Sequence, residues 1–521
     1  MLSLLLLPAL SPQAAGVALG SRALAAQAPR TGGILRVAVP GDPPSLDLHH
    51  TTAYLAEIIA WHVFEPLFTY DARYEIVPML ADSYSVSGDG TSYTIRLRSG
   101  VRFHDGQEMT AEDVAASLQR WLELSQVGGR YIRPILRALS AIDRYTVRIE
   151  LTEPSGVLLP ALAQPVQMAA IYPARIAQQA GGSPISEFVG TGPFRFVEWQ
   201  PNRHIRLARF DGYRPRPEPP SGYGGARAAY VDELRFIPVP DVGTRVAGVR
   251  AGTYHVATDI TTDLYDSLRA DPGLQMLVMK PYGWAVAVFN NRKGVMSNPK
   301  MRQAFLAALD MDEILAGTFG NPVFYRADPG LLFRETPWWT DAGASRYNQK
   351  DPARARSLLQ EAGYRGEPIR WVTSQQYDWA YRPALIASEQ LKRAGFNVVL
   401  EVVDWATVFQ RRSNPDLFDV FSTSFIFSPG VSPPTQPVLL NANYPGWWEN
   451  PEKERLVAQL VREVEPRARY ALWARIQELF WEDVPAVKFG DFFNFSVARR
   501  SVQNYQNTAD MFFWNVWLQE P

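Results

Sequence analysis

The sequence predicts an α/β fold with a large buried core, and three observations support this. Short apolar runs typical of strands alternate with segments of helical periodicity in both halves of the chain. The length of 521 residues suits two or three domains. Hydrophobic residues make up 46% of the chain and charged residues 20%, a globular balance that excludes wholesale disorder.

Charge and cysteine content exclude several classes of function. The formal net charge is −1, so the chain lacks the positive excess that binding a polyanion requires, and we expect no nucleic-acid partner. There is no cysteine, which excludes disulfides, thiolate metal sites, iron–sulfur clusters and cysteine nucleophiles. Aromatic residues reach 12%, and with the near-zero charge they favour binding of a small molecule that is uncharged or amphipathic.

Residues 1–28 are predicted to be a cleavable signal peptide. An apolar stretch is followed by small residues up to Ala28, where we place the cleavage, with Ala25 and Ala26 as alternatives. A membrane anchor is the competing interpretation, but no stretch of about twenty unbroken apolar residues exists. No Lys or Arg precedes Arg22, although a positive start is expected, which points to a translation start further upstream. We therefore expect a periplasmic protein.

The first half of the chain is expected to hold four strands and three helices. Thr110 is a good N-cap, with Asp113 at the third helical position to complete a capping box. The strands are predicted over 34–39, 93–97, 145–151 and 234–237, and the helices over 53–64, 111–122 and 241–250.

The second half contains a β-α-β unit. A strand over 369–373, a helix over 383–394 and a strand over 398–403 follow one another in the order typical of a parallel sheet. Further helices are predicted over 299–309, 352–362 and 467–482.

No arrangement of residues points to catalysis. Nucleotide-binding glycine loops and the common hydrolase motifs are absent. Ser297 and Lys300 match a short pattern of some serine acyl-enzymes, but a helix-capping role for Ser297 or Asn298 explains them better. His49 and His50 are adjacent, so their side chains diverge, and no third ligand lies nearby. We therefore expect no enzymatic activity, no cofactor and no metal.

A series of short blocks, taken in order along the chain, resembles a known family. The blocks are 33–38, 44–47, 64–67, 80–84, 93–106, 110–114, 190–194, 290–291, 301–305 and 351–355. Their order and spacing are similar to those of the extracellular solute-binding proteins of family 5, the peptide/nickel class of ABC importers. The resemblance covers about residues 33–495.

The resemblance implies a two-lobed periplasmic binding protein fold, class II type and cluster C, with an extra domain inserted in the first lobe. Lobe I would comprise 29–58, 186–285 and 490–521, the extra domain 59–185, and lobe II 286–489. Such a protein captures a small solute by hinge closure and delivers it to permease subunits of the importer. It would be a monomer that meets the membrane only through the permease. The alternatives are a secreted carbohydrate-active enzyme, and a chaperone or signalling receptor on the same fold.

The resemblance also places the solute between the lobes, at strand ends and the loops that follow them. The expected ligand-binding residues are Thr52, Tyr54, Tyr131, Thr261, Trp284, Gln375, Tyr377, Trp379, Trp405, Phe425, Phe427 and Ser432. Each aromatic residue has a structural alternative, because Trp and Tyr are commonly part of a core or half-buried.

One departure from the family bears on the ligand. Peptide-binding members carry an Asp that pairs with the α-ammonium of the peptide, whereas the corresponding segment here, 422–432, has no acid. Because an unpaired ammonium is costly to bury, an ordinary zwitterionic dipeptide is disfavoured. A peptide-like ligand, a modified amino compound or an oligosaccharide is expected instead. Nickel is also disfavoured, since the predicted cleft loops of lobe II hold no His.

Overall fold

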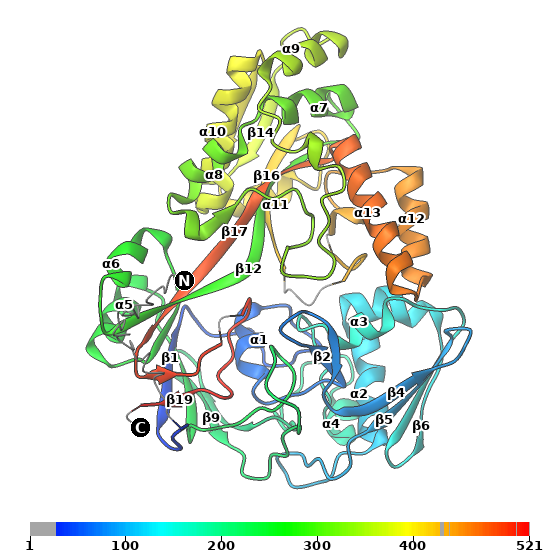
Figure 1. Ribbon diagram of the computed structural model, residues 1–521, viewed down its shortest axis with the longest axis vertical. Helices are drawn as coiled ribbons and strands as arrows, with labels where there is room; N and C mark the ends of the chain where they lie inside the picture. Colours follow the sequence, from blue (N-terminus) through cyan, green and yellow to red (C-terminus); the bar gives the residue numbers. More distant parts are fainter. Residues whose placement is uncertain (1–27, 428–431, 437, 507, 520–521) are drawn as a thin grey trace, which may run out of the picture.

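The computed structural model describes residues 28–427, 432–436, 438–506 and 508–519. The predicted signal peptide, apart from Ala28, and part of the segment 422–432 therefore lie outside the described residues. Figure 1 shows lobe II above, with lobe I and the extra domain side by side below it, where they share one hydrophobic core.

One mixed sheet of eleven strands runs through both lobes of the described chain, in the order β15-β14-β16-β12-β17-β11-β1-β10-β9-β8, with β13 paired to β17. The strands of lobe I are β1 (Ile34–Val39), β8 (Phe194–Gln200), β9 (His204–Arg209), β10 (Glu233–Pro238) and β11 (Val256–Ile260). Those of lobe II are β13 (Tyr325–Arg326), β14 (Ile369–Thr373), β15 (Val398–Val402) and β16 (Val420–Ile426). The α/β class predicted from the sequence is confirmed.

Two long antiparallel strands join the lobes. β12 (Leu274–Phe289) and β17 (Ala486–Arg499) pair with each other along most of their length and cross the molecule diagonally (Figure 1). Leu274 to Met279 pair with β17 in lobe I, and Gly283 to Val288 pair with it in lobe II. The register shifts between Met279 and Gly283. Because a register shift interrupts the ladder, this is where the two lobes can bend relative to each other.

The extra domain is an antiparallel sheet backed by helices. Its strand order is β4-β5-β7-β6, and the Thr110–Asp113 capping box predicted for α2 is confirmed. Its elements are β2 (Phe68–Tyr70), β3 (Ile76–Pro78), β4 (Ala81–Val86), β5 (Ser92–Leu97), α2 (Ala111–Leu124), β6 (Leu136–Asp143), β7 (Thr146–Leu151), α3 (Leu158–Ala163) and α4 (Ala174–Ala180). All of them fall within 59–185; the boundaries of the domain stay a prediction.

The remaining helices cover the sheet of lobe I and that of lobe II. Lobe I carries α1 (Tyr54–Ala60), α5 (Val242–Ala251) and α6 (Tyr265–Arg269). Lobe II carries α7 (Pro299–Ala308), α8 (Met311–Phe319), α9 (Pro352–Glu361), α10 (Asp378–Ala394), α11 (Trp405–Arg411), α12 (Pro451–Arg462) and α13 (Pro466–Asp483). The predicted β-α-β unit is confirmed, because β14 and β15 pair in parallel and α10 connects them.

The start of α10 differs from the prediction. The sequence suggested a helix from Pro383, since proline favours a first turn. The helix begins at Asp378, where the carbonyl of Tyr377 accepts from the amides of Ala380 and Tyr381, and an ion pair of 3.1 Å between Asp378 and Arg382 closes the first turn. Pro383 is the sixth residue of the helix and lies in its interior, where it cannot donate the hydrogen bond to the Trp379 carbonyl that another residue would make.

A buried ion pair fastens the extra domain to lobe I. Asp47, in the loop after β1, accepts from Arg120 of α2 at 2.6 Å, from the Tyr172 hydroxyl at 3.1 Å and from the Ile185 amide at 3.0 Å. Asp47 is fully buried and Arg120 nearly so. Burial acts to raise the pKa of Asp47, but the hydrogen bond and charge of Arg120 leave it below its ordinary value. The carboxylate is therefore charged and paired.

Replacing Arg120 by Met should unfold the protein at lower denaturant concentration. The substitution leaves the Asp47 carboxylate buried without its cation, and breaking such a pair typically costs about 3–5 kcal/mol. Urea unfolding followed by circular dichroism measures the loss. Arg133→Met, at an exposed position of the same domain, is the matched control and should change stability by less than about 0.5 kcal/mol. Equal stability of the two variants would contradict the anchoring role of the pair.

Candidate functional site

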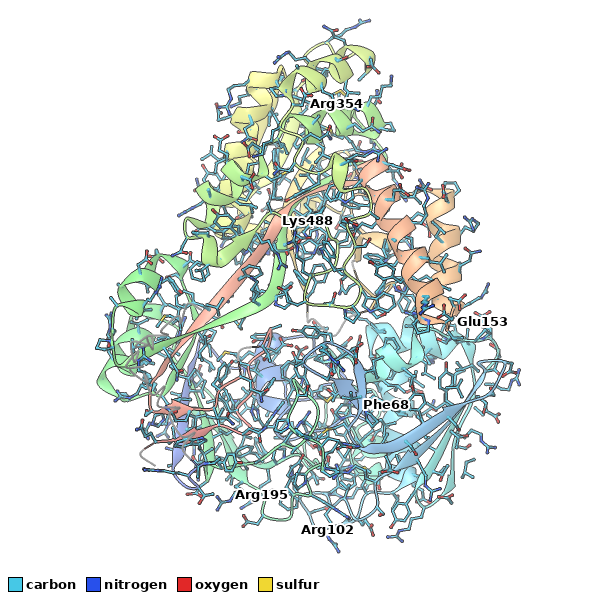
Figure 2. The ribbon with its side chains drawn as sticks, viewed as in Figure 1. Phe68, Arg102, Glu153, Arg195, Arg354 and Lys488 are labelled. Carbon is cyan, nitrogen blue, oxygen red and sulfur yellow. The ribbon has the colours of Figure 1, made fainter. Side chains whose placement is uncertain are left out.

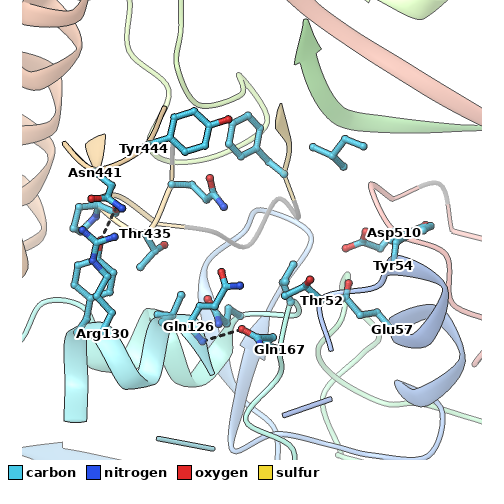
Figure 3. A pocket seen from close by; sticks show the side chains of 18 of the residues that line it. Thr52, Tyr54, Glu57, Gln126, Arg130, Gln167, Thr435, Asn441, Tyr444 and Asp510 are labelled. Carbon is cyan, nitrogen blue, oxygen red and sulfur yellow. Dashed lines mark hydrogen bonds between the residues drawn. The ribbon is translucent and has the colours of Figure 1, made fainter. Parts of the chain in front are cut away.

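A cavity of about 720 Å³ lies where lobe I, the extra domain and lobe II meet (Figure 3). Its size lies within the range of cavities that enclose small-molecule ligands. All three parts of the chain contribute side chains, so the cavity is complete only when the lobes are together. Its lining includes Thr52, Tyr54, Glu57, Gln126, Arg130, Tyr131, Gln167, Tyr282, Arg412, Phe427, Thr435, Asn441, Tyr444 and Asp510.

A second cavity of about 910 Å³ adjoins the first. Tyr282 and Ile426 line both, so these two side chains form the boundary between them. Tyr282 belongs to the stretch of β12 in which the register shifts, and therefore lies at the hinge itself. Lobe I contributes Asp259 and Thr261 to the second cavity.

Six of the twelve predicted ligand-binding residues line these cavities. Thr52, Tyr54, Tyr131 and Phe427 line the first, and Thr261 and Trp379 line the second.

Trp379 and two further aromatic predictions, Tyr377 and Trp405, lie together on lobe II. Tyr377 stacks on Trp379 with ring centroids 4.8 Å apart, and Trp405 meets both edge-on at 5.1 and 5.2 Å. Trp379 sits on α10 rather than on the loop that the sequence suggested. Tyr377 and Trp405 line neither cavity. Contact of these rings with a solute stays a prediction.

The other predicted residues lie behind the cavity wall or away from it. Trp284 is completely buried and stacks on Phe427 with ring centroids 5.4 Å apart, so it supports the wall. Phe425 is buried between Trp284 and Tyr444. Ser432 is buried. Gln375 is exposed and lines neither cavity.

Two carboxyl groups that the sequence analysis did not select lie on the lobe I side of the first cavity. Glu57 of α1 is 2% exposed, and its Oε1 atom has no hydrogen-bond partner among the described residues. Burial, and then the neighbouring charge of Asp510, raise the pKa of Glu57 well above its ordinary value. Asp510 is buried and accepts from the Tyr223 hydroxyl.

One sequence signal could have drawn attention to Glu57, because it is the only charged residue of α1, whose sequence is YLAEIIA. No comparable signal exists for Asp510. Asp510 follows Ala509 near the end of the chain, far along the sequence from α1.

Two arginines provide the opposite charge. Arg130 comes from the extra domain, and Arg412 from the end of α11 in lobe II. Arg412 lies 3.7 Å above the Phe409 ring and donates to the Tyr444 hydroxyl at 3.5 Å. Neither guanidinium forms an ion pair within the part of the chain that the structure describes. Figure 3 shows Arg130 on the far side of the cavity from Glu57 and Asp510, so the cavity is negative at one end and positive at the other.

The second cavity adds another acid from lobe I. Asp259 has a left-handed backbone with φ of 51° and accepts from the Asn494 amide at 3.0 Å. Burial raises its pKa. The described residues of the segment 422–432 contain no acid, as the sequence shows, but lobe I supplies carboxyl groups to both cavities.

The extra domain and lobe II are in direct contact beside the first cavity. Arg469 of α13 is buried and donates to the carbonyl of Gly156 in the extra domain. It also donates to the Ser432 hydroxyl oxygen and the Pro433 carbonyl, both at 3.1 Å. The amide of Gly156 donates to the carbonyl of Val461 at 2.8 Å. We call these four hydrogen bonds the latch contact.

An exposed ion pair accompanies the latch contact. Arg462 of α12 donates to Glu153 at 3.0 Å, and Figure 2 shows Glu153 at the junction of the extra domain with lobe II. On the cavity side, the Tyr131 hydroxyl donates to the carbonyl of Pro434 at 3.4 Å. The lobes are thus held together on both sides of the latch contact.

Two kinds of feature are absent from the part of the chain that the structure describes. No group of three or more His, Asp or Glu side chains is arranged there to hold a metal ion. None of the helices found there has both the length and the apolar character needed to span a membrane.

Comparison with known proteins gives consistent results. The model of the bacterial extracellular solute-binding proteins, family 5, matches residues 75–447. A probable peptide ABC transporter periplasmic-binding protein of Sinorhizobium fredii is 29% identical over 472 residues, 84% of this chain and 85% of that protein. The glutathione-binding protein GsiB of Pectobacterium atrosepticum is 27% identical over 475 residues, 86% of this chain and 87% of that protein.

A solved structure shows the same fold. The ABC transporter substrate-binding protein CtaP of Listeria monocytogenes superposes with a TM-score of 0.82 at 19% identity, covering 94% of this chain and all of that one, 100%. The two-lobed architecture expected from the resemblance is confirmed.

The pH dependence of stability should reveal the buried state of Glu57. Because the folded state holds this proton more tightly than the unfolded chain, ligand-free protein loses stability as the pH rises from about 4.5 through the raised pKa. Glu57→Gln removes this loss, so the variant should gain stability relative to the wild type between pH 4 and pH 8. Urea unfolding at a series of pH values measures the difference.

The matched control is Asp263→Asn, which removes an exposed carboxylate at the second cavity. It should follow the wild-type profile. A Glu57→Gln profile parallel to the wild type over the whole range would show that Glu57 titrates normally.

Proposed function

This chain belongs to the bacterial extracellular solute-binding proteins of family 5, and we propose that it is the solute receptor of an ABC importer. Its task would be to capture a small solute between its lobes and to deliver it to the permease subunits. The observation that carries this proposal is the first cavity, whose walls come from lobe I, the extra domain and lobe II together.

Closure supplies the mechanism. The lobes are joined by β12 and β17, and the register shift between Met279 and Gly283 is the natural place for bending. A solute that contacts both lobes binds the closed arrangement more tightly than the open one, and therefore shifts the population towards closure. The permease would recognise the closed pair of lobes.

The relatives and the lining support a peptide-like or modified amino solute. Two of the relatives in sequence are named for peptides and for glutathione. Rings of Tyr54, Tyr131 and Tyr444 provide apolar surface with hydroxyl groups, and charged groups stand at both ends of the cavity. We include in the proposal a periplasmic location after removal of residues 1–28, and a monomer without enzymatic activity.

The geometry does not favour a carbohydrate-active enzyme. Glycosidases place two carboxyl groups on either side of the bond that they cleave. Glu57 and Asp510, the two acids of the first cavity, lie next to each other on the same lobe (Figure 3).

Protein purified from its native periplasm should retain the solute. We expect mass spectrometry of the denatured protein to release one amino-containing compound in close to equimolar amount, and the same compound to raise the unfolding temperature of stripped protein. Hydrolysis of that compound on prolonged incubation with the protein would instead indicate an enzyme. Protein that retains nothing, and that no peptide, amine or sugar stabilises, would contradict the proposal.

Gly156→Ala should hinder closure without disturbing either lobe. A Cβ atom at this position would overlap the Arg469 guanidinium and the Glu463 carbonyl across the interface. We expect solute affinity to fall by about tenfold, since the closed state becomes less populated. Small-angle X-ray scattering should show that saturating solute no longer reduces the radius of gyration fully.

Gly182→Ala is the matched control, because a Cβ atom there meets no other atom within 4 Å. It should bind and close like the wild type. Wild-type affinity in Gly156→Ala would mean that the latch contact plays no part in closure.

A further inference from the structure

We propose that Glu57 and Asp510 form a seat on lobe I for a positively charged nitrogen of the solute, an ammonium or a guanidinium group. We call this pair the cation seat. The inference rests on the proposed function, because it names the chemical group that the receptor recognises at one end of its cavity. Glu57 and Asp510 of lobe I would take the place of the acid that the described part of the segment 422–432 lacks.

Glu57 is a buried acid with one oxygen atom that lacks a hydrogen-bond partner among the described residues. Its side chain lines the cavity although it is almost completely buried, and the oxygen atom in question is Oε1. A buried polar atom without a partner is costly, and native structures rarely keep one without a reason. An ammonium or guanidinium N–H in the cavity would supply the missing donor.

Asp510 is a second acid in the same cavity as Glu57. It accepts from Tyr223, and Figure 3 shows it beside Glu57. Two neighbouring acids repel when both are charged, so one of them tends to hold a proton in the empty site. A solute cation between them would favour ionisation of both and displace that proton.

Arg227, a cationic residue of lobe I, contacts other side chains instead of Glu57. Arg227 lies 3.7 Å from Glu65 and stacks 4.2 Å from the Trp514 ring. The Tyr54 hydroxyl, which also lines the cavity, donates to the sulfur of Met279 and accepts from the Met511 amide. Within the described residues, no side chain of the protein donates to Glu57 Oε1, and the solute is left as the donor.

The far end of the cavity supports the same assignment. Arg130 stands there and Arg412 lines the same cavity, and neither has a carboxylate partner in the described chain. A solute with a cationic nitrogen at one end and a carboxylate at the other would match both ends, with its nitrogen towards lobe I. A bidentate guanidinium–carboxylate contact would then fix the solute's direction.

The competing role for Glu57 is that of a hydrogen-bond donor. A protonated carboxyl group can donate to a carbonyl oxygen of a neutral solute, and would lose that ability on ionisation. The two roles predict opposite effects of pH: affinity for a cation rises as Glu57 ionises, whereas affinity for a neutral acceptor falls.

Other groups near the seat do not interfere with this distinction. The charged or titratable neighbours are Asp510 and, around it, the tyrosines whose pKa values burial raises above the usual value, so these phenols stay neutral at pH 5–8. They are Tyr54, Tyr74, Tyr223 and Tyr505.

The test uses pairs of probes that differ only in the amine. Trialanine is compared with N-acetyl-trialanine, and glutathione with N-acetylglutathione, by titration calorimetry and thermal shift on stripped protein. We add the retained solute and its N-acetyl derivative. The free amine should bind at least about 100-fold more tightly than its acetylated partner. Its affinity should rise between pH 5 and pH 8.

Two variants test whether Glu57 is responsible for the preference for a free amine. Glu57→Gln keeps the shape of the side chain and should weaken binding of the free amine by at least about tenfold. It should also flatten the pH dependence and leave the acetylated probe unaffected. Asp82→Asn, which removes an exposed charge on β4 at a residue that lines neither cavity, should bind like the wild type. Cooperative urea unfolding of Glu57→Gln confirms that it is folded.

Three results would overturn the cation seat. These are equal binding of acetylated and free amines, unchanged affinity in Glu57→Gln, and affinity that falls as the pH rises. In each case the protein still binds a solute, so the receptor function stands. Failure of every probe and the absence of any retained solute would contradict the receptor function itself, and the cation seat with it.

Discussion

The pairing of β12 with β17 is the constraint on which the rest of the structure depends. Both strands contribute to the sheet of each lobe: in lobe I β17 pairs with β12 and β11, and in lobe II β12 pairs with β17 and β16. Their register shifts between Met279 and Gly283 and again between Ala285 and Val286, and Tyr282, in the first of these stretches, lines both cavities. The proposed bending point and the proposed solute site therefore coincide. The extra domain enlarges lobe I, and the buried pair Asp47–Arg120 fastens the two together.

Charge is distributed unevenly over the cleft, although the whole chain is almost neutral. Lobe I brings carboxyl groups, while the extra domain and lobe II bring Arg130 and Arg412. Such separation is unfavourable in a closed, poorly solvated cavity unless a ligand of complementary charge fills it. The near-zero net charge of the chain thus conceals two opposite local fields around the first cavity.

The sequence predicted much of the fold because the signals were local or ordered. The capping box at Thr110, the β-α-β unit around α10 and the ordered family blocks all depend on residues close in the chain. The site was harder to predict. Trp284 lies in a run of consecutive buried residues of β12, and the sequence of that run does not reveal that the indole faces the core rather than the cleft. Glu57 and Asp510 lie 453 positions apart, 510 minus 57, and only tertiary packing brings them together. Trp379 was assigned to a loop because Pro383 suggested a later helix start.

The geometry of Arg469 has a consequence for the length of the solute. Burial lowers the pKa of this arginine to about 10, and its hydrogen-bond partners named above are carbonyl and hydroxyl oxygens rather than carboxylates. Two of those oxygens belong to Ser432 and Pro433, which immediately precede the cavity-lining residues Pro434 and Thr435. A solute long enough to push this segment outward would withdraw acceptors from a buried guanidinium, which is costly. A solute that overfills the cavity would therefore bind less tightly. The cost would come from the lost hydrogen bonds of Arg469 and not from a contact between Arg469 and the solute.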